Sequence, residues 1–286
     1  MIDAETESQV HSALARLQPA WHPRDVDELV PMPAGLSNAN FALRHRGERF
    51  VLRLARRGVS GAIERRSEYD LLSSRLARVS APLVAYALPE GDLLTRFVPG
   101  ALLVDASAHP AMLASYVAGL HARLRPFGWH HPLPELVHAW FESAADAGAT
   151  IIPAWRDGLA QLRPEDAVGP CHNDLNPWNV IVTADSPRRW CTLDWEWCGD
   201  HMPLFDVVAL CEGLGLADAA TSEVVGRYLH LRDQRAADPA RLDDLRLRFQ
   251  LRECAWAHAA AARFGARVEL DEQILRSSAA LDRLLR

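Results

Sequence analysis

The hydrophobic residues of this chain follow two different periods, and the change between them falls near Pro99 and Gly100. Before that point, apolar and polar side chains alternate as in half-buried strands, in residues 27–33, 40–46, 49–55, 82–86 and 93–97. After it, apolar residues recur at helical spacing, most clearly in residues 109–124, 203–216 and 245–264. The pattern therefore predicts an α+β chain with two lobes. A small antiparallel sheet with one helix would occupy residues 1–99, and a larger, mainly helical lobe would occupy residues 100–286.

The composition limits the partners that such a chain can have. At 286 residues, with 49% hydrophobic and 24% charged side chains, the chain is long enough for a core in each lobe. The net charge of -6 argues against nucleic-acid binding, which clustered cations drive. The amino terminus is acidic, no apolar run is long enough to span a bilayer, and the five cysteines form no CxxC pair. These features predict a cytoplasmic protein that does not enter membranes. Lysine is absent from the sequence, so arginine must carry every basic role.

One polar segment, Cys171–Val180, has the residue types that phosphoryl transfer needs. It reads CHNDLNPWNV, and because Asn, Asp and Pro also favour ordinary turns, its meaning depends on the rest of the chain. Transfer from ATP needs an acceptor for the substrate hydroxyl proton, ligands for a metal ion and cations near the phosphates. Asp174 can accept the proton, and Asn179 and Asp194 offer the oxygen ligands that Mg²⁺ prefers. A short strand predicted over residues 190–193 would present Asp194 at its end.

The first lobe supplies candidate residues for a nucleotide. Arg53 lies on the third predicted strand, and Glu68 on the predicted helix that follows can orient it. A guanidinium is permanently charged and matches phosphate oxygens with a planar fork, so it can act without a lysine. The loop that contains Gly35, Ser37 and Asn38 can fold over the phosphates and offer backbone N–H groups. The residue types that binding of ATP and Mg²⁺ requires therefore occur in a workable order along the chain.

The ordered motifs resemble the protein-kinase-like superfamily and, within it, the aminoglycoside phosphotransferase and choline/ethanolamine kinase group. The resemblance rests on HNDLNPWN, LDWEW and PLFDVVAL, and on GLSNANF, FVLRLA and RRSEYDLL before them. It runs from Gly35 through the helix that contains Asp206, and more loosely to Trp256. It implies a bilobal protein-kinase-like fold, with Asp174 as the catalytic base. It further implies that His172 shapes the catalytic loop and that Asp206 anchors it.

The same motifs argue against two other classes of ATP-binding protein. A protein kinase carries HRD, DFG and APE sequences, whereas here Asn173 takes the arginine position, Trp195 and Glu196 follow Asp194, and no APE occurs. A Walker-type protein carries GxxxxGK[ST], which is also absent. The phosphate acceptor is therefore expected to be a small alcohol.

The aromatic residues near these motifs favour a cationic acceptor. Aromatic faces attract quaternary and aromatic cations, and the resemblance places Trp197 where choline kinases carry an enclosing tyrosine. The candidate acceptor residues are Trp197, Glu196, Glu212 and Trp256. The predicted reaction transfers the γ-phosphate of ATP to choline or ethanolamine.

Other acceptors are also possible, and so is a binding protein without catalytic activity. Thiamine is also a cationic primary alcohol and fits the same description, and an aminoglycoside is a further alternative. A catalytically silent binding protein is disfavoured because Asp174, Asn179 and Asp194 are all present. The sequence makes no prediction of oligomeric state.

Overall fold

The computed structural model of the protein describes residues 3–32, 38–55, 65–88, 90–165, 168–183, 186–234, 238–265 and 267–286. By its internal contacts the chain divides into two compact units. Unit 1 comprises Met1–Ser107, Ala122–Arg125 and Pro177–Cys198, and unit 2 comprises Ala108–His121, Pro126–Asn176 and Gly199–Arg286. Each unit thus gathers segments that are distant in sequence, and the division into lobes at residue 99 stays a prediction.

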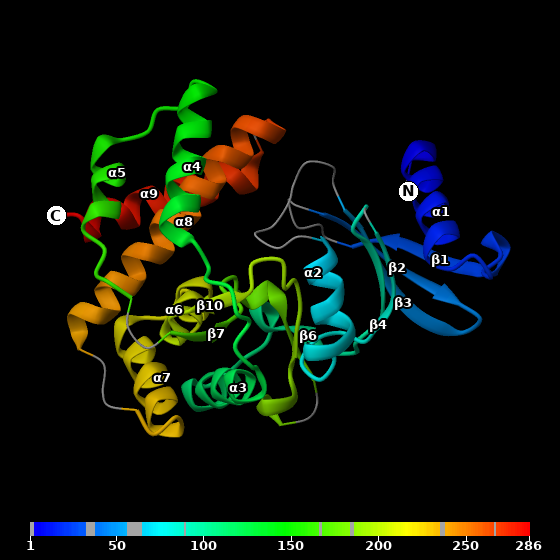
Figure 1. Ribbon diagram of the computed structural model, residues 1–286, viewed down its shortest axis with the longest axis horizontal. Coiled ribbons are helices and arrows are strands. Elements are labelled where there is room, and N and C mark those ends of the chain that lie inside the picture. Colours follow the sequence, from blue (N-terminus) through cyan, green and yellow to red (C-terminus); the bar gives the residue numbers. More distant parts are fainter. Residues whose placement is uncertain are drawn as a thin grey trace. The chain divides into compact units, whose positions relative to one another are not determined.

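Unit 1 is built on an antiparallel sheet with the strand order β1-β2-β3-β5-β4 (Figure 1). All five predicted strands are confirmed, as β1 Val26–Pro31, β2 Asn38–His45, β3 Glu48–Ala55, β4 Leu83–Ala87 and β5 Asp92–Arg96. The predicted turn between β2 and β3 is also present, with φ of 50° at Arg46 and 85° at Gly47. Positive φ at both central residues suits the twist of a tight hairpin. The register of this hairpin pairs Asn40 with Arg53.

A helix that the sequence interpretation did not include packs on this sheet. Helix α1 spans Ala4–Leu17, and the side chain of Asp3 caps it by accepting a hydrogen bond of 2.8 Å from the Thr6 N–H. Its apolar stripe joins sheet residues in the unit 1 core, namely Val10, Ala13, Leu14, Leu17, Phe41, Leu43, Phe50, Leu52 and Leu94. We expected one helix in residues 1–99, and the described residues there form both α1 and α2. The spacing of Val10, Leu14 and Leu17 is helical and was a readable signal.

The predicted helix after β3 is present over its described part. Helix α2 spans Arg65–Asp70 and continues as a π-helical turn over Leu71–Arg75, while residues 61–64 lie outside the described residues. Unit 1 also contains a small sheet of β6 Ala101–Leu102, β8 Val180–Val182 and β9 Cys191–Thr192. The described part of unit 1 also contains 3-10 turns at Pro23–Asp25, Leu103–Asp105, Pro177–Asn179 and Pro187–Arg189.

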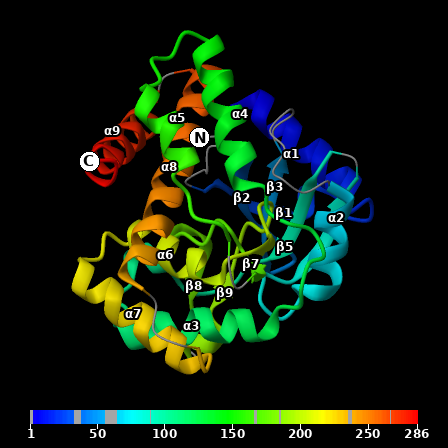
Figure 2. The same cartoon turned by 60° about the vertical axis from the view of Figure 1, so that its left-hand side comes forward.

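Unit 2 is mainly helical, as predicted (Figure 2). Its helices are α3 Pro110–Arg123, whose last turn is grouped with unit 1, α4 Leu133–Asp146, α5 Pro153–Ala160, α6 Pro203–Gly213, α7 Asp218–Leu231, α8 Pro239–Phe264 and α9 Val268–Leu284. Helix α8 contributes to a core with α4, α5, α6 and α9 that includes Phe141, Trp155, Phe205, Leu251 and Leu281. Two short strands, β7 Gly169–Cys171 and β10 Gly199–His201, pair antiparallel. Among the described residues, no helix is both long and apolar enough to cross a bilayer.

Candidate active site

The catalytic segment begins where β7 ends, in unit 2. Strand β7 pairs with β10 so that Cys171 faces Gly199, and His172 follows directly. Gly199 lies close to an aromatic side chain, because a Cβ there would come within 3.2 Å of the Trp129 ring. The Asn173 side-chain amide donates to the Gly199 carbonyl at 3.3 Å. The loop is therefore tied at its start to a short, closely packed strand pair.

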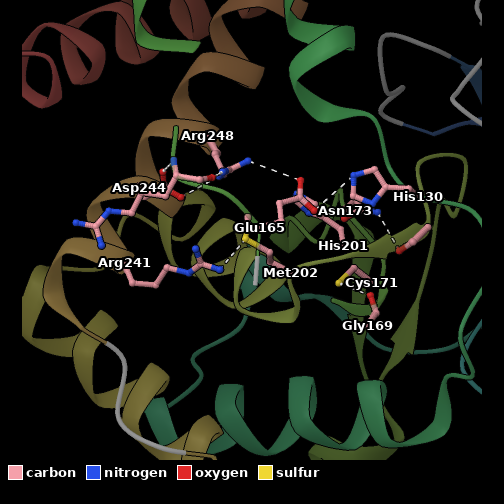
Figure 3. A network of polar contacts seen from close by, with 12 residues as sticks. His130, Glu165, Gly169, Cys171, Asn173, His201, Met202, Arg241, Asp244 and Arg248 are labelled. Carbon is pink, nitrogen blue, oxygen red and sulfur yellow. Dashed lines mark hydrogen bonds and ion pairs between the residues drawn. The ribbon is translucent and has the colours of Figure 1, made fainter. Parts of the chain in front are cut away.

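A polar network braces β10 from helix α8 (Figure 3). One carboxylate, Glu165, lies 3.4 Å from the ring nitrogens Nε2 of both His130 and His201, and 3.8 Å from Nη1 of Arg248. Burial alone would raise the pKa of Glu165, but the two histidines and Arg248 outweigh it and lower that pKa. The network supports the strand on which the loop is built.

The loop backbone is bound to helix α6 through one buried carboxylate. Asp206 accepts hydrogen bonds from the His172 N–H at 2.7 Å and the Asn173 N–H at 2.8 Å, and His121 Nε2 lies 2.9 Å from the same carboxylate. Burial would raise the pKa of Asp206, but the His121 contact and the backbone donors lower it overall. The carboxylate thus connects α6 to two successive loop residues.

The loop has a left-handed turn immediately before Asp174. Asn173 has a φ of 63°, which few residues other than glycine adopt without support. The ring of the buried His172 accepts a hydrogen bond on Nδ1 from the Asp174 N–H at 3.2 Å. The Asn176 side chain donates to Asp174 Oδ1 at 3.3 Å. In this geometry His172 contacts the loop backbone, which agrees with a shaping role for that residue.

Arg252, which the sequence interpretation did not consider, also contacts the loop. From helix α8 its Nη2 pairs with Asp174 Oδ1, and its Nη1 donates to the Asn173 carbonyl at 2.7 Å. Burial would lower the pKa of Arg252, but Asp174 and Glu253 outweigh it and raise that pKa. Arg252 and Asp174 are 78 positions apart in the sequence, so no local pattern could have predicted their contact.

In unit 1, the fold brings Arg53 and Glu68 together as predicted from their chemistry. Arg53 Nη2 lies 2.6 Å from Glu68 Oε1, and both side chains are buried. The Tyr86 hydroxyl donates to Glu68 Oε2 at 2.5 Å, a contact that sequence reasoning missed. Burial alone would lower the pKa of Arg53, but Glu68, Asp194 and Glu196 raise it overall. The guanidinium is therefore a fixed, permanent cation.

The candidate metal ligands also lie in unit 1, at one end of the β8–β9 pair. Asn179 directly precedes β8, Asp194 lies just past β9, and the Leu193 N–H donates to the Asn179 carbonyl at 2.7 Å. Asp194 has a left-handed φ of 56°, and its Oδ1 is 3.7 Å from Arg53 Nη1. An amide and a carboxylate oxygen at one strand end suit a hard cation, so these residues fit Mg²⁺. Arg53 thus contacts one candidate metal ligand directly, and the backbone of the residue before that ligand bonds the other.

The predicted phosphate-loop residues are only partly within the described chain. Gly35 and Ser37 lie outside the described residues. Asn38 begins β2 opposite Ala55, and its buried side-chain oxygen has no hydrogen-bond partner among the described residues.

The predicted acceptor residues are divided between the two units. Glu196 is buried and Trp197 half-buried in unit 1, and Trp256 is half-buried on α8 in unit 2. Trp256 follows Arg252 by one helical turn and therefore shares its face. Glu212 is engaged elsewhere, because it accepts from Arg246 Nε at 3.2 Å and from the Gln250 side chain at 2.9 Å. Its charge is thus already compensated.

Unit 1 has a five-stranded antiparallel sheet with a buried Arg–Glu pair, and unit 2 is mainly helical. This combination defines a protein-kinase-like fold. The model of the phosphotransferase enzyme family, known as APH, matches residues 28–245. This chain belongs to that family.

Solved structures similar to this chain show the same fold. Choline kinase LicA from Streptococcus pneumoniae has a TM-score of 0.79 at 16% identity, with coverage of 98% of this chain and 100% of that one. A choline/ethanolamine kinase family protein from Mesorhizobium loti has a TM-score of 0.70 at 18% identity, covering 98% and 94%. The structure of LicA in complex with AMP has a TM-score of 0.74 at 15% identity, with coverage of 99% of this chain and 100% of that one.

Similar sequences include two thiamine kinases. The thiamine kinase of Shigella boydii serotype 4 (strain Sb227) is 26% identical over 205 residues, which cover 69% of each chain. The thiamine kinase of Escherichia coli (strain K12) is 27% identical over 195 residues. That match covers 65% of this chain and 65% of the kinase, slightly less than two thirds of its length.

Proposed function

We propose that this protein is an ATP- and Mg²⁺-dependent kinase that transfers the γ-phosphoryl group of ATP to the hydroxyl of a small cationic alcohol. The observation that carries this proposal is the Arg53 guanidinium, which lies 2.6 Å from Glu68 and 3.7 Å from Asp194. Three residues distant in sequence thereby place a permanent cation beside a candidate metal ligand. That combination suits the phosphates of a metal-bound nucleotide.

In this mechanism Asp174 accepts the proton of the acceptor hydroxyl as its oxygen attacks the γ-phosphorus. The bond between that phosphorus and the oxygen bridging to the β-phosphate breaks, and ADP leaves with the electron pair. Asn179 and Asp194 would hold Mg²⁺, which neutralises charge on the phosphates when it is bound. Arg53 binds phosphate oxygens, and Glu68 keeps its guanidinium in place.

The aromatic residues favour a cation on the acceptor. Trp197 and Trp256 offer ring faces, each able to contribute about 0.5–2 kcal/mol to binding of a quaternary or aromatic cation. The buried carboxylate of Glu196 adds negative charge near Trp197. Glu212 is a weaker candidate, because Arg246 compensates it.

Two groups of acceptors fit this description. Choline or ethanolamine is supported by the LicA and Mesorhizobium loti structures, which carry those names and share the fold. Thiamine is supported by the two thiamine kinases at 26% and 27% identity. Both alternatives share one physical description, a primary hydroxyl near a positive charge.

The test is Mg²⁺-dependent ADP release from the purified protein with choline, ethanolamine, thiamine and kanamycin in turn. Asp174→Asn serves as the inactive variant, because it removes the proton acceptor and keeps the side-chain shape. Asp218→Asn is the matched control, since that carboxylate is 90% exposed at the start of α7. Turnover of one cationic alcohol that disappears only in Asp174→Asn is expected.

Other results would contradict parts of the proposal. Equal turnover in Asp174→Asn would exclude Asp174 as the base. Turnover of kanamycin alone would overturn the small-alcohol assignment. Binding of Mg²⁺-ATP without turnover of any acceptor would show that the proposed acceptor class is wrong.

A further inference from the structure

One side chain of helix α8, Arg252, contacts two successive residues of the proposed catalytic loop. The two terminal nitrogens of the Arg252 guanidinium have different partners. Nη2 pairs with the Asp174 carboxylate, and Nη1 donates to the Asn173 carbonyl. A planar guanidinium can make both contacts at once, whereas an ammonium group lacks this fixed fork. We propose that Arg252 is a positioning residue that fixes the orientation of Asp174 for proton transfer, an inference that rests on the proposed kinase function.

The loop needs such a support because its backbone is unusual at this point. Asn173 has a left-handed φ of 63°, and a conformation of that kind persists only where surrounding contacts enforce it. Three contacts do so: the Asn173 N–H bonds Asp206, its side-chain amide bonds the Gly199 carbonyl, and its own carbonyl accepts from Arg252. The first two hold the amide and the side chain. Arg252 holds the carbonyl, which is part of the peptide unit that leads into Asp174.

Arg252 also limits rotation of the Asp174 carboxylate. Its Nη2 and the Asn176 side chain both approach Oδ1, which fixes one oxygen from two directions. Proton abstraction requires the base to lie within hydrogen-bond reach of the acceptor hydroxyl. A carboxylate that turns freely would meet this requirement less often, so loss of Arg252 should act on the chemical step.

Arg252 is itself held in place by a second layer of contacts. Its Nη2 lies 3.4 Å from Glu253 Oε1, and the Gln273 side chain donates to Glu253 Oε2 at 3.0 Å. Gln273 belongs to α9, so the chain of contacts runs from α9 through α8 to the loop. A side chain with only 13% exposure and partners on both sides has little freedom to move.

The test compares Arg252→Gln and Arg252→Lys with Arg263→Gln. Arg263 is the control, since it is an exposed arginine about three turns later on the same helix α8 and contacts no residue of the loop in the described structure. For Arg252→Gln we expect kcat to fall about 100-fold, as misplacement by one ångström can do, while the KM for ATP stays within about twofold of wild type. Arg252→Lys should retain more activity than Arg252→Gln, and Arg263→Gln should keep the wild-type kcat.

Hydrogen–deuterium exchange of residues 171–176 gives a second readout that does not depend on turnover. Faster exchange of this segment in both Arg252 variants, but not in Arg263→Gln, supports the inference. Unchanged exchange overturns it, and so does an unchanged kcat or an equal fall in kcat for Arg263→Gln. If the wild-type protein phosphorylates no acceptor, the proposed function fails, and the exchange data still decide whether Arg252 holds the loop. If Arg252→Gln does not fold, Arg252→Lys carries both measurements.

Discussion

Replacing Asp206 with asparagine should strongly destabilise unit 2 and abolish phosphoryl transfer. The buried carboxylate faces three nitrogens, those of the His172 and Asn173 backbone and Nε2 of His121, at 2.7–2.9 Å. Asparagine keeps one acceptor oxygen and presents an NH₂ group at the other position. At least one charge-assisted hydrogen bond is then lost, and a buried donor meets another donor.

The expected loss in the free energy of unfolding is about 3–5 kcal/mol, because one charge-assisted bond contributes about 1.5–3 and a stranded buried donor costs about 1–3. That is a large share of the roughly 5–15 kcal/mol that stabilises a typical domain. Asp218→Asn is the control: its carboxylate is 90% exposed and pairs with Arg246 at 2.8 Å. An exposed pair of this kind contributes about 1 kcal/mol or less.

The pH dependence supplies an independent check on Asp206. Its pKa in the folded protein is lowered, so the unfolded chain binds a proton more readily than the folded protein does. The stabilisation is therefore complete above the ordinary carboxyl pKa of about 4 and is lost as the pH falls below it. The Asn variant should lack this component of the acid-induced loss.

Urea denaturation followed by tryptophan fluorescence measures the stability, and ADP release measures the activity. The buried Trp155 of the unit 2 core contributes to this signal together with the other tryptophans of the chain. A loss below about 1 kcal/mol, the range of the exposed control pair, would refute the reasoning. So would wild-type turnover in the Asn variant, since the loop would then not depend on this anchor.

Three further predictions test other parts of the protein. Tyr86→Phe removes the hydroxyl that donates to Glu68 at 2.5 Å, and the KM for ATP should rise several-fold in steady-state assays while the fold is retained; an unchanged KM would mean that Glu68 needs no such support. Burial and the positive charges of neighbouring His and Arg side chains lower the pKa of His131 well below its usual range, so stability should fall as the pH drops below about 6.5. In His131→Asn that component should be smaller, and an identical pH profile of the melting temperature would contradict the assignment. Trp197→Ala should raise the KM of the acceptor more than that of ATP, whereas the reverse would assign Trp197 to the nucleotide site or to folding.

Two features of the sequence were enough to predict most of the architecture. Period-two alternation identified all five strands of the main sheet. One face of that sheet packs against a core, so apolar side chains tend to recur at every second position along a strand. Helical periodicity identified α3, α6 and α8 for the same reason. Helix α1 was missed even though Val10, Leu14 and Leu17 carry the pattern.

The sequence motifs supplied the main candidate residues of the site, but not the side chains that contact and support them. Asp174 and Asn179 share one motif, and a strand between turns separates that motif from Asp194. The contacts of Tyr86 with Glu68 and of Glu212 with Arg246 follow no local rule, and they come from elements that meet only after folding.

The sequence by itself determined the secondary structure, the motif order and the residue types available for chemistry, because burial imposes a period that can be read along the chain. Only the tertiary structure decided which charges are compensated and which side chains support others. Arg252 and Asp174 illustrate the reason: 78 positions separate them, and a contact at that separation depends on how α8 packs on the elements around the loop. Local patterns specify the elements, whereas their packing specifies the partners of each charged group.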